Sequence, residues 1–324
     1  MVYYVFKMNN QIAIGILAYN VAEYIEDVLS EVQDLNLTIF VIDDSSSDGT
    51  SELLEELKNK YNFKLQKNTK NYGAGHSTKA LIENASNDGF KFLIKVDGDG
   101  QFEINDIKKI AELYSENNYK FIKSNRFWTG GIKGKIPKKR LFGNLFATIL
   151  LQIVAGTNKL YDPLNGLFGV STEITKDLDK NYPNRYGYPF YITAVSIMNE
   201  LETFQINNVV KYENQKSNLN PLKVLAILLR LSIFFYFKKI KIKKSIGIYQ
   251  RSAFLDLSFL TSFFITLYLI IQTIYIVNFA EYSLIAPRTI LIILFLNLLL
   301  NLLIFVLSFK EEKAIRNVYI DCER

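Results

Sequence analysis

The stretch Phe90-Lys-Phe-Leu-Ile-Lys-Val-Asp-Gly-Asp-Gly-Gln101 decides how this chain folds. Its apolar run predicts a buried strand, and the Asp-Gly-Asp-Gly string predicts a turn at the carboxyl end of that strand. Open α/β sheets bind ligands at this edge. Side chains at i and i+2 of an extended segment point the same way, so Asp97 and Asp99 are placed to share one hard cation. An ordinary Asp/Gly surface turn is the alternative that the string alone leaves open.

Apolar runs alternate with amphipathic runs on both sides of this stretch. The expected strands cover residues 11–18, 38–42, 63–66, 90–96 and 119–123, and the expected helices cover 23–35, 50–60, 77–85 and 104–116. Strands interleaved with helices are typical of a parallel, doubly wound sheet. The predicted fold class is therefore α/β, with a mostly parallel, Rossmann-like sheet.

The composition changes near residue 220. Residues 257–277 and 289–309 are two runs of 21 residues without a charge, each long enough to cross a bilayer as a helix. Residues 221–237 are apolar but contain Arg230 and precede a lysine-rich segment, which favours a helix lying on the membrane over a third span. The predicted organisation is a first domain over 1–220, an interfacial helix and basic linker over 221–252, two transmembrane helices over 253–310 and a tail over 311–324.

Basic residues flank the two apolar runs. They are Lys238, Lys239, Lys241, Lys243, Lys244 and Arg251 before the first run, and Lys310, Lys313 and Arg316 after the second. The positive-inside bias therefore predicts a multi-pass protein of the cytoplasmic membrane, with the first domain in the cytosol. A net charge of +6 gathered at these flanks suits an anionic lipid surface and not nucleic acid. The single Cys322 excludes an intrachain disulfide.

Four more strings accompany the Asp-Gly-Asp motif. They are Ile14-Gly-Ile-Leu-Ala-Tyr-Asn20, Val41-Ile-Asp-Asp-Ser-Ser-Ser-Asp-Gly-Thr50, Asn71-Tyr-Gly-Ala-Gly75 and Asp162-Pro-Leu-Asn-Gly-Leu-Phe-Gly169. In order and spacing the five resemble the inverting family-2 glycosyltransferases with a GT-A fold. The interfacial helix and two-helix hairpin that follow resemble the polyprenyl-phosphate branch, which includes enzymes similar to dolichyl-phosphate mannosyltransferase and bactoprenol glucosyltransferase. The resemblance covers nearly the whole chain.

The resemblance implies a donor pocket for a nucleotide sugar. The residues that match it are Ala18, Tyr19, Asn20, Asp43, Asp44, Asn71, Gly73, Lys79, Asp97 and Gln101. Asp43 and Asp44 would accept hydrogen bonds from the base and ribose. A helix-capping loop is the alternative for those two residues. His76, the only histidine, matches no family position and is expected in a loop.

The resemblance also implies catalytic and acceptor residues. Asp97 and Asp99 would ligate Mg²⁺ or Mn²⁺ on the diphosphate, and Arg126 and Arg140 would complete the catalytic set. Phe102 stands where many relatives carry a histidine. The acceptor site would comprise Lys138, Lys139, Arg140, Asn144, Asp162 and Asn165, with the basic cluster receiving the phosphate of a polyprenyl acceptor.

One departure from the family decides which acceptor the sequence favours. The segment 185–192 lacks the acidic residue that many relatives carry there. A hydroxyl acceptor needs a general base, whereas a phosphate monoester is already ionised at pH 7. We therefore predict transfer of a hexose from a UDP- or GDP-sugar to polyprenyl phosphate. A glycan acceptor and a non-catalytic nucleotide-sugar-binding partner are the alternatives. The sugar, the nucleotide and homo-oligomer formation are left open.

Overall fold

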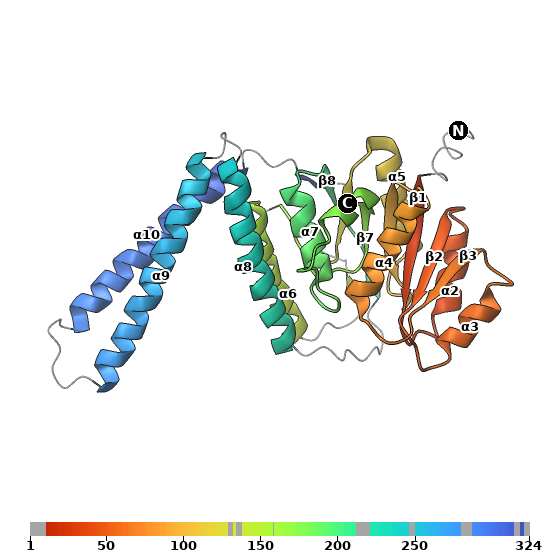
Figure 1. Cartoon of the computed structure of the whole chain (residues 1–324), viewed down its shortest axis with the longest axis horizontal. Helices are drawn as coiled ribbons and strands as arrows, with labels where there is room; N and C mark the ends of the chain where they lie inside the picture. The colour runs from red at the N-terminus through yellow and green to blue at the C-terminus, as the bar shows by residue number, and fades with distance from the viewer. Residues whose placement is uncertain are drawn as a thin grey trace. The chain divides into compact units, whose positions relative to one another are not determined.

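The structure, a computed structural model, describes residues 11–128, 132–133, 138–157, 159–211, 221–245, 250–279, 287–313 and 318–320. These residues form two compact units. One unit contains the described residues up to Ser232 together with 318–320, and the other contains those from Ile233 to 313. Figure 1 follows the chain through both.

The first unit is built on one eight-stranded sheet with the strand order β10-β8-β5-β7-β4-β1-β2-β3. The strands are β1 (Ile12–Ala18), β2 (Thr38–Asp43), β3 (Phe63–Lys67), β4 (Phe92–Asp97), β5 (Phe121–Asn125), β7 (Phe168–Ser171), β8 (Thr203–Asn207) and β10 (Val318–Ile320). Neighbouring strands are parallel except at β7, which runs antiparallel to both β4 and β5. A separate parallel pair joins β6 (Ile132–Lys133) to β9 (Val210–Lys211).

Helices cover both faces of this sheet. On one face, the apolar sides of α2 (Ile25–Gln33), α3 (Thr50–Leu57) and α5 (Ile104–Asn117) join alternate side chains of β1, β2 and β4 in the main core. On the other face lies α4 (Ala74–Asn87), which contacts β1, β2 and β4. Every residue of β1 is buried, as a strand covered on both faces requires. The doubly wound, mostly parallel arrangement predicted from the sequence is confirmed.

The expected strands and helices up to residue 125 are all present, with ends shifted by a few residues. One shift changes an interpretation, because α4 begins at Ala74 and includes His76. The expectation that His76 lies in a loop is wrong. Its ring stacks on Tyr72 with centroids 4.6 Å apart. The N–H of Ser77 donates to the carbonyl of Gly73 at 3.1 Å, which is the first bond of the helix, and the N–H of His76 donates to the Asn184 carbonyl at 2.8 Å.

Three further helices precede or enter the C-terminal unit. They are α6 (Lys138–Ala155), α7 (Tyr188–Met198) and α8 (Pro221–Ser245). All eleven residues of α7 are buried, so this helix belongs to the core. On α8, large apolar side chains are exposed at every fourth position, namely Leu225, Leu229, Ile233 and Phe237. Such a stripe is typical of a helix that meets an apolar medium along one side.

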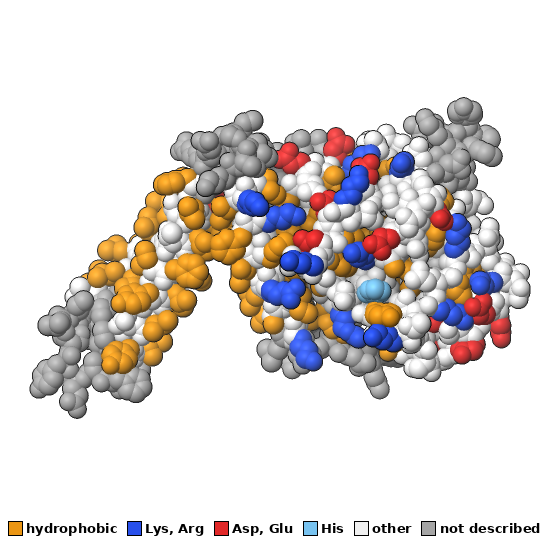
Figure 2. Space-filling view, in the orientation of Figure 1, with side chains coloured by type: hydrophobic (Ala, Val, Ile, Leu, Met, Phe, Trp, Pro, Cys, Tyr) orange, Lys and Arg blue, Asp and Glu red, His pale blue; other side chains and the backbone are white. Residues whose placement is uncertain are grey.

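The second unit contains two long apolar helices, α9 (Gln250–Phe279) and α10 (Pro287–Lys313). Within them, Phe254–Tyr275 and Leu291–Ser308 are long and apolar enough to cross a membrane, and α8 does not meet that criterion. Exposed apolar side chains cover this pair (Figure 2). The two helices pack together through polar contacts, with the hydroxyl of Ser262 2.6 Å from Asn297 Oδ1. The boundaries at residues 220, 252 and 310 remain predictions.

Candidate active site

The carboxyl ends of β4, β1 and β2 lie next to one another and carry three of the predicted motifs. Ala18 pairs with Asp43 across β1 and β2, and Leu17 pairs with Asp97 across β1 and β4. The backbone N–H of Gly98 also donates to the Leu17 carbonyl at 2.9 Å. The sheet thus brings Ala18, Asp43 and Asp97, which are predicted to line the nucleotide-sugar pocket, to one edge, because parallel neighbouring strands end on the same side.

The loops after β1 and β2 are joined by side-chain hydrogen bonds. Asn20 has a left-handed backbone (φ +53°), and its Oδ1 accepts from the N–H of Ser47 at 2.8 Å. The N–H of Asn20 donates to Ser46 Oγ at 3.0 Å. Asp43 Oδ1 in turn accepts from the N–H and hydroxyl of Ser46. Tyr19 projects from this junction with 47% of its surface exposed, which leaves an aromatic face available to a ligand.

Asp44 anchors the glycine loop that follows β3. It is buried and accepts from the N–H groups of Gly73 (2.8 Å) and Tyr72 (3.1 Å) and from the Asn68 amide (2.7 Å). Neither Asp43 nor Asp44 caps α3, whose N-cap is Gly49; in this loop Asp48 Oδ1 accepts from the N–H of Thr50 at 3.0 Å. Asp44 therefore positions residues 71–73 at the same edge of the sheet as Asp97.

Segment 182–185 packs closely against this glycine loop. A Cβ on Gly75 would lie 2.0 Å from the Pro183 carbonyl oxygen, and one on Gly73 would lie 2.4 Å from Arg185 Cγ. The Arg185 guanidinium donates to the carbonyl of Asn71 at 3.1 Å. Glycine is required at both positions because any side chain would push the loop away. Lys79, predicted beside the nucleotide, donates to the Leu178 carbonyl at 3.0 Å.

Asp97 lies between a buried lysine and a glycine. Lys95 is fully buried, and its ammonium donates to Asp97 Oδ1 and to the Tyr188 hydroxyl, the latter at 2.7 Å. Burial lowers the pKa of Lys95, but its electrostatic interactions and hydrogen bonds with Asp97 and Tyr188 together hold the pKa above its ordinary value. On the other side, a Cβ at Gly166 would lie 2.2 Å from Asp97 Oδ2. The Asp162–Gly169 motif therefore packs directly against the Asp-Gly-Asp motif.

Asp99 lies two residues after Asp97 and has a strongly raised pKa. Burial and then the charge of Asp97 raise the pKa of Asp99 to about 7. Its Oδ1 accepts from the N–H of Gln101 at 3.3 Å. Among the described residues, no three or more His, Cys, Asp or Glu side chains gather into a group that holds a metal ion. Two carboxylates fit a hard divalent cation only if a further ligand, such as a diphosphate, supplies the remaining oxygens.

A cavity of about 500 Å³ opens on the α2 and α5 side of Asp99. Its lining includes the acidic residues Glu23, Asp27, Glu31 and Glu103. Like charges would repel a diphosphate from this space. A diphosphate that reaches Asp99 is therefore expected on the opposite side, where the ends of β1 and β2 lie.

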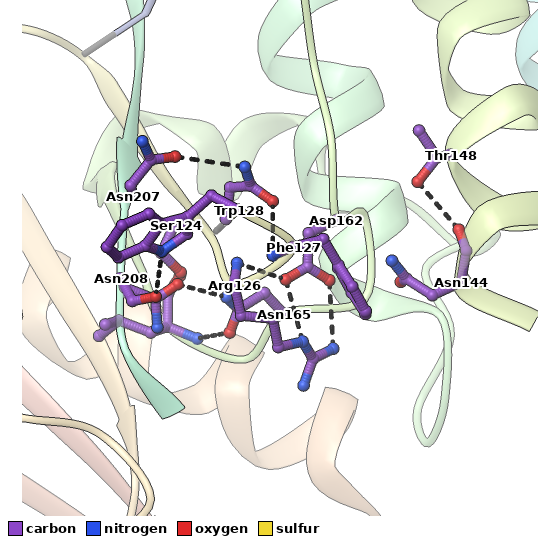
Figure 3. Close-up of polar contacts among 12 residues, drawn as sticks. Ser124, Arg126, Phe127, Trp128, Asn144, Thr148, Asp162, Asn165, Asn207 and Asn208 are labelled. Carbon is purple, nitrogen blue, oxygen red and sulfur yellow. Dashed lines mark hydrogen bonds and ion pairs between the residues drawn. The ribbon is translucent and has the colours of Figure 1, made fainter. Parts of the chain in front are cut away.

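Arg126 and Asp162, predicted separately for phosphate and acceptor, form one buried ion pair (Figure 3). Arg126 Nε lies 2.9 Å from Asp162 Oδ2, and Nη2 lies 3.1 Å from Oδ1. The N–H of Arg126 also donates to Asp162, whose backbone is left-handed (φ +51°). Burial lowers the pKa of the nearby Lys123 to about 8. Asn165 is buried beside them and donates to Asn208 Oδ1 at 3.0 Å.

The remaining acceptor residues lie on α6. Lys138, Lys139 and Arg140 form its first turn, and their side chains fall outside the part of the chain that the structure describes. Asn144, one turn later, is 5% exposed, and its Oδ1 has no hydrogen-bond partner (Figure 3). Phe142, Leu145 and other large apolar side chains of the same helix are exposed. The helix therefore combines a basic N-terminal turn with an apolar outer face.

Sequence reasoning missed two residues of this site, Lys95 and Tyr188. Lys95 had a usable signal, because a lysine in an apolar strand, two positions before Asp97, must share its face. Tyr188 had none, since it lies 93 residues from Lys95 in the sequence and only the packing of α7 joins them.

Comparison with known proteins identifies the class that this fold and edge belong to. The model of the family described as glycosyl transferase family 2 matches residues 13–178, which is half of the chain. The chain therefore belongs to glycosyl transferase family 2, and it is a glycosyltransferase.

Two archaeal relatives have named activities. A dolichol-phosphate mannosyltransferase of Pyrococcus furiosus is 28% identical over 176 residues, which are 53% of this chain and 49% of that enzyme. A UDP-N-acetylglucosamine–dolichyl-phosphate N-acetylglucosaminyltransferase of Methanococcus voltae is 27% identical over 177 residues, 50% of this chain and 70% of that enzyme. An uncharacterized protein of Methanocaldococcus jannaschii is 30% identical over 169 residues, which are 50% of this chain and 72% of that protein.

A solved structure shows the same fold. Glucosyl-3-phosphoglycerate synthase from Mycobacterium tuberculosis, crystallised with phosphoglyceric acid, aligns with a TM-score of 0.54 and 14% identity over 70% of this chain and 84% of that one. The same enzyme has been crystallised with Mn²⁺ and UDP-glucose. At this identity the likeness establishes the fold alone, and it confirms the predicted GT-A architecture.

Proposed function

We propose that this glycosyltransferase moves a hexose from a UDP- or GDP-sugar to polyprenyl phosphate at the cytosolic leaflet, with inversion. The observation that carries the proposal is one chain that joins two features. A family-2 domain presents Asp97 and Asp99 at the ends of β4, β1 and β2, and two helices long enough to cross a membrane follow it. A polyprenyl chain stays in the bilayer, so an enzyme that uses it must work at the membrane surface.

In this proposal the donor lies along the ends of β1, β2 and β4. Asp43, the loop at Asn71–Gly73 and the exposed Tyr19 surround the nucleotide, while Asp99 with Asp97 faces the diphosphate. Asp99 fits Mg²⁺ or Mn²⁺, because burial and the neighbouring charge of Asp97 disfavour its carboxylate form, and a bound cation would stabilise that form. When bound, such a cation stabilises the charge on the departing nucleoside diphosphate.

The acceptor attacks with its phosphate oxygen. A new bond forms between that oxygen and the anomeric carbon, and the bond from this carbon to the diphosphate oxygen breaks in line, which inverts the configuration. The segment 185–192 offers no carboxylate to act as a base, and an ionised phosphate needs none. The basic first turn of α6 suits that phosphate, and the exposed apolar face of α6 suits the lipid around it.

The names of the two dolichyl-phosphate relatives support a polyprenyl-phosphate acceptor. The basic flanks of the two apolar helices favour a multi-pass protein of the cytoplasmic membrane with its first domain in the cytosol. We further propose that Arg140 and Asn144 contact the acceptor. Arg126 and Asp162 instead act as a buried support beneath the site, since the guanidinium of Arg126 and the carboxylate of Asp162 are already paired with each other.

The test is a transfer assay with the full chain in detergent, Mn²⁺ or Mg²⁺, and a panel of labelled UDP- and GDP-sugars. Short-chain polyprenyl phosphate is compared with the matching polyprenol, which has a hydroxyl in place of the phosphate. We expect label from one donor to enter the lipid phase only with the phosphate acceptor, and to disappear in Asp99→Asn. Transfer to the alcohol, or no transfer to either lipid from any donor, would reject the proposed acceptor.

A further inference from the structure

Lys95 is a buried charge at the site for which the motifs assign no task. Its side chain has no exposed surface, and it lies in the middle of the sheet on β4. Removing an ammonium group from water is costly unless it is paired and hydrogen-bonded. Lys95 has two such partners, Asp97 on its own strand and Tyr188 at the start of α7. Its contacts therefore run between the Asp-Gly-Asp motif and a core helix.

Asp97 is held from two sides. Its Oδ1 accepts a hydrogen bond from Lys95. Its Oδ2 is so close to Gly166 that a Cβ added to this glycine would lie 2.2 Å from it. The same absent Cβ would lie 3.3 Å from the Lys95 ammonium. Even so, 29% of the Asp97 side chain is exposed. The carboxylate thus faces the open edge of the sheet while its orientation is set from inside the protein.

We propose that Lys95 is a positioning residue for the donor site. Held by Tyr188, its ammonium fixes the Asp97 carboxylate in the orientation that meets the nucleotide and its cation. This inference rests on the proposed function, because it assumes that a nucleotide diphosphate and a divalent cation bind at Asp97 and Asp99. It adds to that function two residues, Lys95 and Tyr188, that act through Asp97 without touching the donor.

Two roles for Lys95 predict opposite results when it is replaced. If its charge merely competes with the cation for Asp97, then Lys95→Met removes a repulsive charge and Mn²⁺ binds more tightly. If Lys95 orients Asp97, the variant loosens that carboxylate and Mn²⁺ binds more weakly. Partners that orient a metal ligand typically change metal affinity about 10- to 100-fold. The direction of the change therefore separates the two roles.

The experiment titrates Mn²⁺ into the full-length protein in detergent with saturating UDP or GDP, followed by calorimetry. Lys95→Met is expected to bind Mn²⁺ about 10- to 100-fold more weakly. Tyr188→Phe should shift in the same direction by less, since it removes one contact of the ammonium. Tyr191→Phe is the matched control: it is buried on the same helix, and its hydroxyl bonds Asp177 and Asp179 instead. It should bind like the wild type.

Unchanged or tighter Mn²⁺ binding in a folded Lys95→Met protein overturns the inference. If that variant does not fold, unchanged binding in Tyr188→Phe does so. A wild-type protein that binds neither nucleotide with Mn²⁺ would instead reject the proposed function itself, so the two failures are distinct.

A double variant tests whether Lys95 acts through Asp97. In an Asp97→Asn protein the carboxylate is already gone, so adding Lys95→Met should cause no further loss of Mn²⁺ affinity. Losses that simply multiply would show that Lys95 acts independently, and they would overturn the inference. A purely structural lysine would lower the melting temperature without this non-additivity.

Discussion

Gly166→Ala tests how closely the Asp162–Gly169 motif must approach the Asp-Gly-Asp motif. The new Cβ would lie 2.2 Å from Asp97 Oδ2, whereas real Cβ atoms essentially never come within 3.0 Å of such an atom. Either Asp97 or the loop must therefore move by on the order of 1 Å. Displacements of this size in an active site can cost about 100-fold in rate, and overpacking costs about 1–3 kcal/mol of folding free energy.

We expect Gly166→Ala to lower turnover about 100-fold and to weaken Mn²⁺-dependent nucleotide binding. The assay is sugar transfer per folded molecule, with folding followed by circular dichroism during heating. Gly169→Ala is the matched control, because its Cβ would meet the Phe92 ring at 2.5 Å, away from both carboxylates. That variant should lose stability but keep its donor affinity. Wild-type turnover and nucleotide affinity in Gly166→Ala would refute the reasoning.

Four more outcomes follow from the contacts and from the raised pKa of Asp99. Asp162→Asn leaves the Arg126 charge buried without its carboxylate, so the free energy of unfolding should fall by about 3–5 kcal/mol; an unchanged thermal melt would contradict this. Because the pKa of Asp99 is raised to about 7, a cation must displace its proton, so Mn²⁺ affinity should rise from pH 6 to 8 and level off above; a flat profile would contradict it. The same raised pKa means that, without metal, melting temperature should fall as pH rises from about 4 to 7, because the folded state then binds the extra proton. In the apolar hairpin, Asn301→Leu removes the 2.8 Å hydrogen bond to Thr266, so the association of α9 and α10 should weaken by about 0.6–1.7 kcal/mol. The measurement is a denaturant titration in detergent. Leu302→Ala, which changes an exposed side chain, is the control and should not weaken the association.

The sequence alone determined the order of strands and helices and the motifs at the strand ends. Hydrophobic periodicity is a local property, so β1, β2 and β4 and the helices between them can be read without coordinates. The same holds for the two long apolar runs, whose length and lack of charge set them apart. Parallel packing then fixes that the motifs after β1, β2 and β4 meet at one edge, because neighbouring strands end together.

The sequence could not assign a partner to each polar residue of the site. From the sequence, Asp44 was a candidate nucleotide contact or part of a helix-capping loop, and only the structure shows that it anchors the loop at Gly73, 29 residues away. Arg126 and Asp162 looked like separate contacts, yet they pair across 36 residues. Each of these contacts depends on how distant segments pack, and no local pattern encodes that packing.

Only the tertiary structure placed β7 antiparallel between β4 and β5, although it follows both in the chain. This insertion carries the preceding Gly166 against Asp97, and the burial of α7 carries Tyr188 to Lys95. A sequence fixes which residues are apolar, charged or flexible. Which charges end up neutralising one another is decided by the three-dimensional contacts that fill the interior, because a buried charge is tolerated only where packing supplies its partner.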